Sequence, residues 1–97
     1  MNPKKIRPEQ QNIAKKRYQP PKQIKIEHQE FLLKVGMKLQ GLRKEKDISS
    51  SGLAKQVGIS RNGYHLMETG RVYFNLLTFL NILGYHDKSV SDFFKDL

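Results

Sequence analysis

Four side chains suited to nucleic-acid recognition share the outward face of a short predicted helix that begins after Ser60. The face points outward because Tyr64 and Met67 occupy the inward positions of the same helix. An arginine can donate two parallel hydrogen bonds to guanine, an asparagine amide pairs similarly with adenine, and a leucine packs on the thymine methyl group. The outward set consists of Arg61, Asn62, His65 and Leu66.

Two short helices joined by a tight turn are expected to position this face. The first has an apolar stripe from Leu53 to Val57, and Gly58 ends it. Ser60 then caps the second helix. The unit covers about residues 50–69, and a unit of this kind presents one rigid helix that usually fits the major groove of DNA.

The Asn62-Gly63 dipeptide has a competing interpretation, because it is also a strong signal for a β-hairpin turn. A hairpin requires flanks with alternating polarity, and the residues on either side do not alternate. The helix is therefore favoured. Gly63 either lets the helix approach DNA closely or reflects neutral variation at an exposed site.

The chain is small and strongly basic. Its 97 residues contain 18 Lys and Arg against 9 Asp and Glu, a net charge of +9. This balance favours a polyanionic partner, either nucleic acid or an anionic membrane surface. The absence of cysteine excludes a disulfide framework, a thiolate zinc site and a cysteine nucleophile. A core of this size is marginal, so a partner subunit would stabilise it.

The chain shows no signal for secretion or for membrane insertion. Its N-terminus is charged and lacks the apolar segment of a signal peptide. No apolar run approaches the roughly 20 residues that span a bilayer. We therefore expect a soluble cytoplasmic protein associated with the nucleoid, or a nuclear one if the source is eukaryotic.

Residues 1–27 differ in composition from the remainder. They contain eight basic and two acidic residues, a net charge of +6, and all four prolines. Few large apolar groups occur there, which predicts a flexible basic arm. The arm either follows DNA phosphates or enters a minor groove, or it is only a solvated tail. Ile24 and Ile26 form a strand-like alternation that a neighbour could order.

Residues 28–97 predict an all-α domain of five short helices with no convincing strand. In the first, Phe31, Val35, Leu39 and Leu42 share one face. The fourth is apolar nearly all round and should end at Gly84. The predicted helices cover about residues 28–46, 50–57, 61–69, 75–83 and 90–97.

Two apolar segments are candidates for contact with a second copy of the chain. The alternative is that both close the core of a monomer. A dimer would place two copies of the outward helix about 34 Å apart and predict a palindromic site. The segments are the connector Val72, Tyr73 and Phe74 and the C-terminal Phe93, Phe94 and Leu97.

The segment from Val35 to Gly70 resembles the helix-turn-helix domain of the phage repressor and Cro family, the xenobiotic-response-element (XRE) type of bacterial regulator. The resemblance runs without a gap through VGMKLQGLRKEKDISSSGLAKQVGISRNGYHLMETG and more loosely to the C-terminus. It implies a lambda-repressor-like fold. It also implies a small, homodimeric transcriptional regulator that binds double-stranded DNA in a sequence-specific way, and repression is the expected outcome of that binding. The positions that carry it are Leu42 with Arg43, Leu53 with Ala54, Gly58, Ser60, and Glu68 with Gly70.

The resemblance also implies roles for individual residues. Arg43 and Glu68 would form a structural ion pair, and Arg61, Asn62 and Leu66 would contact base edges. Serine at Ser50 departs from the glutamine that is common in the family, and the connector after Gly70 is short and lacks the common proline. The phosphate contacts would be Ser49, Ser50, Ser60, His65, Thr69 and Arg71.

Other functions have less support. No carboxylate pair, Ser/His/Asp set, phosphate-binding glycine loop or metal-ligand spacing is present, so we expect neither an enzyme nor a bound metal or cofactor. An antitoxin, or a bridging module that uses the same fold to bind a partner protein, is the main alternative. The polar outward face of the second helix favours DNA over that alternative.

Overall fold

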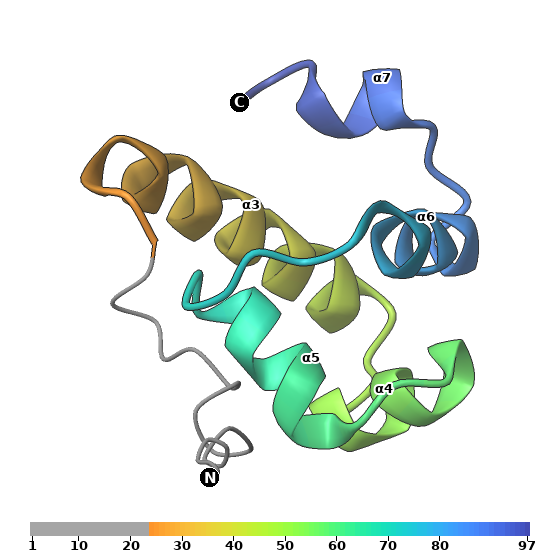
Figure 1. Cartoon of the computed structure of the whole chain (residues 1–97). Helices are drawn as coiled ribbons and strands as arrows, with labels where there is room; N and C mark the ends of the chain where they lie inside the picture. Colours follow the sequence, from red (N-terminus) through yellow and green to blue (C-terminus); the bar gives the residue numbers. More distant parts are fainter. Residues whose placement is uncertain (1–23) are drawn as a thin grey trace, which may run out of the picture.

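The structure, a computed structural model, describes residues 24–97, which form five α-helices and contain no strand (Figure 1). The predicted all-α fold is confirmed for this part of the chain. Residues 1–23 of the predicted basic arm lie outside the described residues. The helices are α3 (Ile26–Glu45), α4 (Ser50–Val57), α5 (Arg61–Glu68), α6 (Leu76–Tyr85) and α7 (Val90–Phe94).

The first helix begins slightly before its predicted start. The expected strand-like alternation is wrong, because Ile26 opens α3 and is exposed while Ile24 is buried. One position of the inward stripe differs, since Leu32 is buried in place of the expected Phe31, whereas Val35, Leu39 and Leu42 are buried as predicted. Phe31 lies half exposed at the edge of the core and stacks on Phe94, with the ring centroids 5.9 Å apart.

The last two helices end differently from the prediction. Gly84 does not end α6, which continues through Tyr85. The chain reverses at Asp87, whose φ of 57° lies in the left-handed region that aspartate tolerates better than most residues. The final helix is also shorter than predicted and stops at Phe94.

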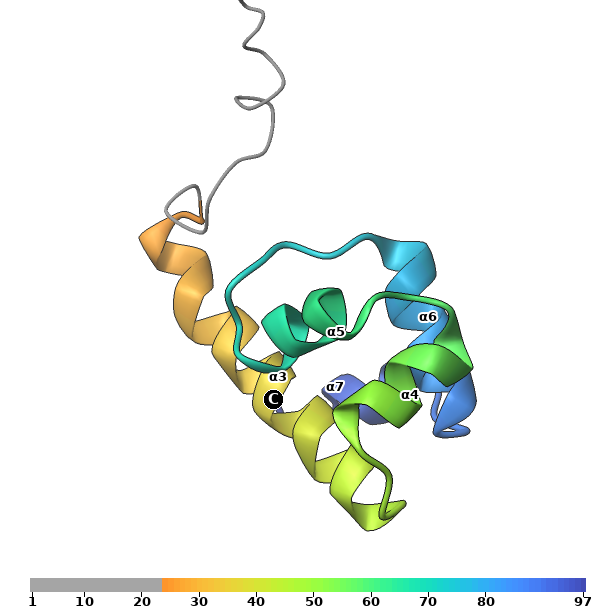
Figure 2. The same ribbon diagram turned by 90° about the horizontal axis from the view of Figure 1, so that it is seen from below.

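A single core is formed where the inward faces of all five helices meet. In the view from below, α5 lies in the middle of the molecule, with α3 on one side and α4 and α6 on the other (Figure 2). Large side chains from each helix close the centre of the core. Those that are fully buried are Val35, Leu39, Leu53, Tyr64, Ile82, Leu83 and Phe93.

The segments predicted as a dimer surface mainly close this core instead. Val72 and Phe74 pack against it from the connector, and Phe93 is fully buried. Phe74 also stacks on Phe79, with the centroids 5.2 Å apart. Exposed apolar side chains lie on both α3 and α6, and on α6 Leu76 is 67% exposed, Leu77 70% and Leu80 41%.

The backbone of α3 comes close to the end of α5 at Gly36. A Cβ atom at this position would lie 2.6 Å from the carbonyl oxygen of Met67 and closer still to that of Glu68. Glycine lowers helix propensity, and packing compensates for it here. Gly41, five residues further along the same helix, has nothing within 4 Å of such a Cβ atom.

Substitution by alanine should have opposite effects on stability at these two glycine positions. Gly36→Ala should destabilise the protein by about 1–3 kcal/mol, because the added methyl group pushes α3 away from the α5 backbone. Gly41→Ala should stabilise it by up to about 1 kcal/mol through helix propensity alone. Urea unfolding of both variants measures the difference. Equal stabilities for the two variants would contradict the close approach.

Candidate nucleic-acid interface

Side-chain caps define the starts of α4 and α5. The hydroxyl of Ser49 accepts a hydrogen bond from the backbone N–H of Gly52 at 3.0 Å, and that of Ser60 accepts one from Gly63 at 2.9 Å. Between the helices, Gly58 has a φ of 78°, which favours glycine. These features give a short and well-defined turn between α4 and α5.

The structure brings Arg43 and Glu68 together across α3 and α5. The Nε atom of Arg43 donates to Oε2 of Glu68 at 2.6 Å, and Nη2 donates to Oε1 at 3.3 Å. A third hydrogen bond, at 2.9 Å, joins Nη1 to the carbonyl oxygen of Ile48 just before α4. Both side chains are largely buried, so one bidentate contact holds α3, α5 and the approach to α4 in register.

The hydroxyl of Tyr64 is buried beside this pair and makes no hydrogen bond with good geometry. Burial is the main cause that raises the pKa of Tyr64, and the neighbouring Glu68 carboxylate raises it further. The hydroxyl therefore stays protonated. The aromatic ring contributes to the core, whereas the oxygen contributes little.

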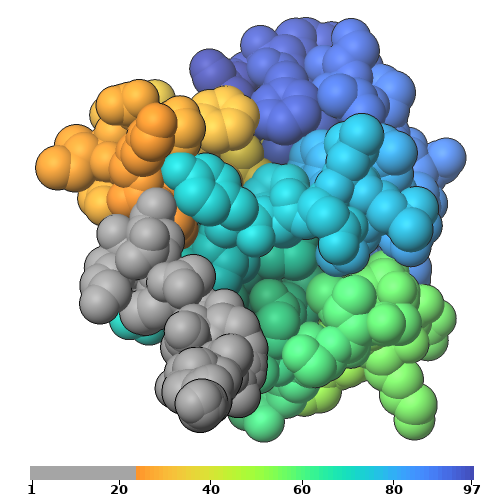
Figure 3. Space-filling view, viewed as in Figure 1, coloured from red at the N-terminus to blue at the C-terminus, as the bar shows by residue number. Residues whose placement is uncertain are grey.

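The outward side of α5 is polar. Arg61, Asn62 and His65 are exposed and, together with the half-buried Ser50 at the start of α4, line a shallow hollow. The space-filling view shows the surface of α4 and α5 on the side of the molecule away from α7 (Figure 3). The hollow therefore combines one guanidinium, one amide and one imidazole with the N-terminal end of α4.

Leu66 does not join this hollow. It is half-buried and lines a second, more apolar groove with Gly63, Val72 and Phe74, between α5 and the connector. A Cβ atom at Gly63 would also meet the Ser60 hydroxyl at 2.9 Å. Glycine at this position therefore leaves room for the helix cap, a reason that the sequence pattern did not indicate.

The predicted phosphate contacts lie at the start of α4, at the start of and along α5, and just after α5. Ser49, Ser60, His65 and Arg71 are exposed. Thr69 differs, because its hydroxyl donates within the chain, to the carbonyl oxygens of His65 at 3.0 Å and Leu66 at 3.3 Å. The hydroxyl proton of Thr69 is therefore already donated to acceptors within the chain.

Sequence analysis placed Tyr73 in a candidate dimer surface and did not predict its hydrogen bonds to the start of α3. Its hydroxyl accepts the backbone N–H of Lys25 at 3.2 Å and lies 2.6 Å from Nδ1 of His28. More than forty residues separate the partners along the chain, so no local pattern could have indicated the contact.

Within residues 24–97, no group of three or more His, Asp or Glu side chains is placed to hold a metal ion. Over the same part of the chain, no helix has both the length and the apolar character needed to cross a membrane.

A solved structure supports the helix-turn-helix architecture. The crystal structure of the restriction-modification controller protein C.AhdI from Aeromonas hydrophila superposes with a TM-score of 0.65 and 28% sequence identity, over 69% of this chain and 97% of that one. This chain has an XRE-like helix-turn-helix fold. No model of a protein family matches the chain, and no curated protein matches it either.

The buried ion pair predicts a large effect of losing its negative charge. Glu68→Gln should destabilise the fold by about 3 kcal/mol or more, because it leaves the buried Arg43 without a counter-charge. Tyr64→Phe should cost nothing or stabilise the protein, since it removes a buried hydroxyl that has no partner. Thermal and urea unfolding compare the two. A Tyr64→Phe variant as unstable as Glu68→Gln would show that the hydroxyl belongs to the network.

Proposed function

We propose that this protein is a DNA-binding transcriptional regulator that recognises a specific duplex sequence by placing α5 in the major groove. The observation that carries the proposal is the exposed polar side of α5, whose opposite side is held by Tyr64, Met67 and the Arg43–Glu68 pair. A rigid helix of this kind loses little entropy when it docks. The net charge of +9 suits a polyanion, and the likeness to a restriction-modification controller suits a regulatory role.

Within this proposal, the side chains divide into two roles. Arg61 and Asn62, in the first turn of α5, would contact base edges through paired hydrogen bonds. Leu66 would contact a thymine methyl group from the neighbouring groove. The residues around them would bind phosphates, with Thr69 the weakest candidate because its proton is used internally. The phosphate set is Ser49, Ser50, Ser60, His65 and Arg71.

Repression is the simplest regulatory outcome of this binding mode, because a protein seated on a promoter blocks the polymerase from the same DNA. Selection of bound fragments from a random double-stranded pool tests the proposal directly. A consensus sequence supports major-groove recognition, and a palindromic consensus supports a symmetric dimer. Recovery of fragments without any common sequence would contradict it.

We also propose that two copies of the chain form a homodimer through α6. The segment from Asn75 to Tyr85 contains no charged residue, although the chain is strongly basic. Leu76, Leu77 and Leu80 project from it into solvent. Two copies can meet on this face without bringing charged side chains together.

A partner protein is the second candidate occupant of the α6 face. The same exposed leucines suit an antitoxin or bridging module that holds a different protein while α5 binds DNA. The two possibilities differ in a measurable way, because only self-association appears with the purified chain alone.

Arginine substitutions separate base contacts from phosphate contacts. Arg61→Ala should weaken binding to the selected sequence by about 1–3 kcal/mol and relax the base preference at one position. Arg71→Ala, the matched control, should weaken binding to all sequences alike and reduce the salt slope by about 1. Fluorescence anisotropy at several salt concentrations measures both. An equal loss on cognate and random duplexes for Arg61→Ala would contradict a base contact.

Charge on the α6 face should prevent self-association. Leu77→Glu places a carboxylate in the centre of the apolar face and should shift the purified protein to a monomer in sedimentation equilibrium. Met37→Glu, at a position of α3 that is also exposed, should leave the oligomeric state unchanged. A dimer that survives Leu77→Glu would place the interface elsewhere.

A further inference from the structure

The Asn62-Gly63 pair places a side-chain amide next to the least hindered backbone nitrogen that can attack it. Asparagine loses ammonia more readily before glycine than before any other residue, because no side chain shields the glycine nitrogen. The product is a cyclic succinimide, which water opens to aspartate or isoaspartate. Both residues lie in the first turn of α5, and Asn62 is exposed to solvent there.

The helical backbone of α5 opposes this reaction. Ring closure brings the nitrogen of Gly63 onto Cγ of Asn62, and it requires the ψ angle of Asn62 to leave the helical range. The attacking nitrogen is also engaged, since its N–H donates to the hydroxyl of Ser60 at 2.9 Å. This N–H belongs to the group at a helix start that has no backbone acceptor within the helix. A single side-chain hydroxyl therefore takes the place of a backbone carbonyl.

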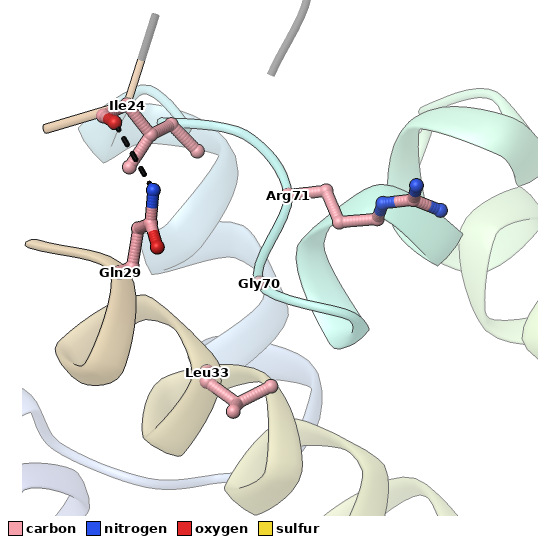
Figure 4. Close-up of a pocket in the computed structure, with 5 residues that line it drawn as sticks. All are labelled: Ile24, Gln29, Leu33, Gly70 and Arg71. Atoms are coloured by element: carbon pink, nitrogen blue, oxygen red, sulfur yellow. Dashed lines mark hydrogen bonds between the residues drawn. The ribbon is translucent and has the colours of Figure 1, made fainter. Parts of the chain in front are cut away.

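The remainder of α5 is held more firmly than its first turn. Tyr64 follows this turn directly and is fully buried. At the other end of the helix, the turn at Gly70 lies against Leu33 of α3, and a Cβ atom at Gly70 would be 2.7 Å from Cα of Leu33 (Figure 4). Local opening of α5 is therefore expected over residues 61–63 rather than along the whole helix.

We propose that Asn62-Gly63 is a self-modification site, at which the Ser60 hydroxyl controls how fast the amide is converted to aspartate or isoaspartate. When the cap opens, a bond forms between the nitrogen of Gly63 and Cγ of Asn62. The bond from Cγ to Nδ2 breaks, and ammonia leaves with the proton of the backbone nitrogen. Water then cleaves the ring at either carbonyl carbon, so the net change replaces an NH2 group by OH.

The chemistry is independent of the proposed function, whereas its consequence for DNA binding rests on it. An aspartate in the first turn interacts favourably with the positive end of the helix dipole, so the fold is retained. Its carboxylate has no N–H group to donate to a base and repels the phosphates. Isoaspartate inserts an extra carbon into the backbone and shifts Arg61 relative to the rest of α5. The protein would therefore lose sequence recognition before it loses its structure.

The experiment follows the full-length protein during incubation at neutral and mildly alkaline pH. Peptide mass spectrometry measures the conversion of Asn62, and methylation by an isoaspartyl methyltransferase detects isoaspartate. Ser60→Ala deletes the cap and should accelerate the conversion about fivefold, the ratio that corresponds to a typical N-cap contribution. Ser49→Ala is the matched control, because it deletes the equivalent cap of α4, which binds the N–H of Gly52 at 3.0 Å. It should leave the rate at Asn62 unchanged.

A second measurement tests the consequence for DNA. Asn62→Asp reproduces one product and should raise Kd for the selected duplex about five- to a hundredfold, the effect of losing one paired base contact. Gln40→Glu makes the same change from amide to carboxylate at an exposed position of α3 and should have little effect. A saturating amount of the duplex should also slow the conversion of Asn62, because docking of α5 keeps its first turn closed.

Two results would overturn the inference. Equal conversion rates in Ser60→Ala and the native protein, including no conversion in either, would show that the cap does not control the reaction. Equal acceleration by Ser49→Ala and Ser60→Ala would assign the conversion to global unfolding. Failure of the proposed function looks different. The conversion and its dependence on Ser60 would then persist, while neither Asn62→Asp nor the duplex would have its expected effect.

Discussion

The contact between the end of α5 and the middle of α3 determines where the outward face of α5 points. Arg43 spans the two helices and binds Glu68 through two hydrogen bonds, and Gly36 lets the backbones approach more closely than any other residue would. A buried pair of opposite charges tolerates little displacement, because each charge would lose its compensation. The orientation of α5, and with it the proposed DNA contact, depends on this junction.

Because the inward side of α5 is fixed, its outward side can present side chains at defined positions. The caps at Ser49 and Ser60 set the starts of both helices of the unit. The molecule also separates its contacts by chemistry. Polar and basic groups gather around α5, whereas the uncharged leucine face lies on α6. Under the proposed function, DNA and a second protein would therefore bind to different surfaces of the molecule.

Local sequence rules succeeded where a single residue determines the backbone conformation. The cap at Ser60 and the helix end at Gly58 were predicted correctly, because capping and positive φ are properties of one residue and its immediate neighbours. Local sequence rules failed where either of two neighbouring residues could occupy the same buried position. Phe31 and Leu32 are both apolar, and only the packed structure shows that Leu32 is buried while Phe31 stacks on Phe94 of α7. Gly84 looked like a helix end, but the reversal occurs at Asp87.

The sequence alone determined the helical content, the helix-turn-helix unit and the polar character of the outward face, because helix periodicity, caps and charge are encoded over a few neighbouring residues. The tertiary structure decided which apolar residues remain exposed. Val72 and Phe74 are as hydrophobic as Leu76 and Leu77, yet the first two pack against the core and the last two face solvent. It also decided that Tyr73 meets Lys25 and His28. Both outcomes depend on how distant helices pack, and no local pattern carries that information.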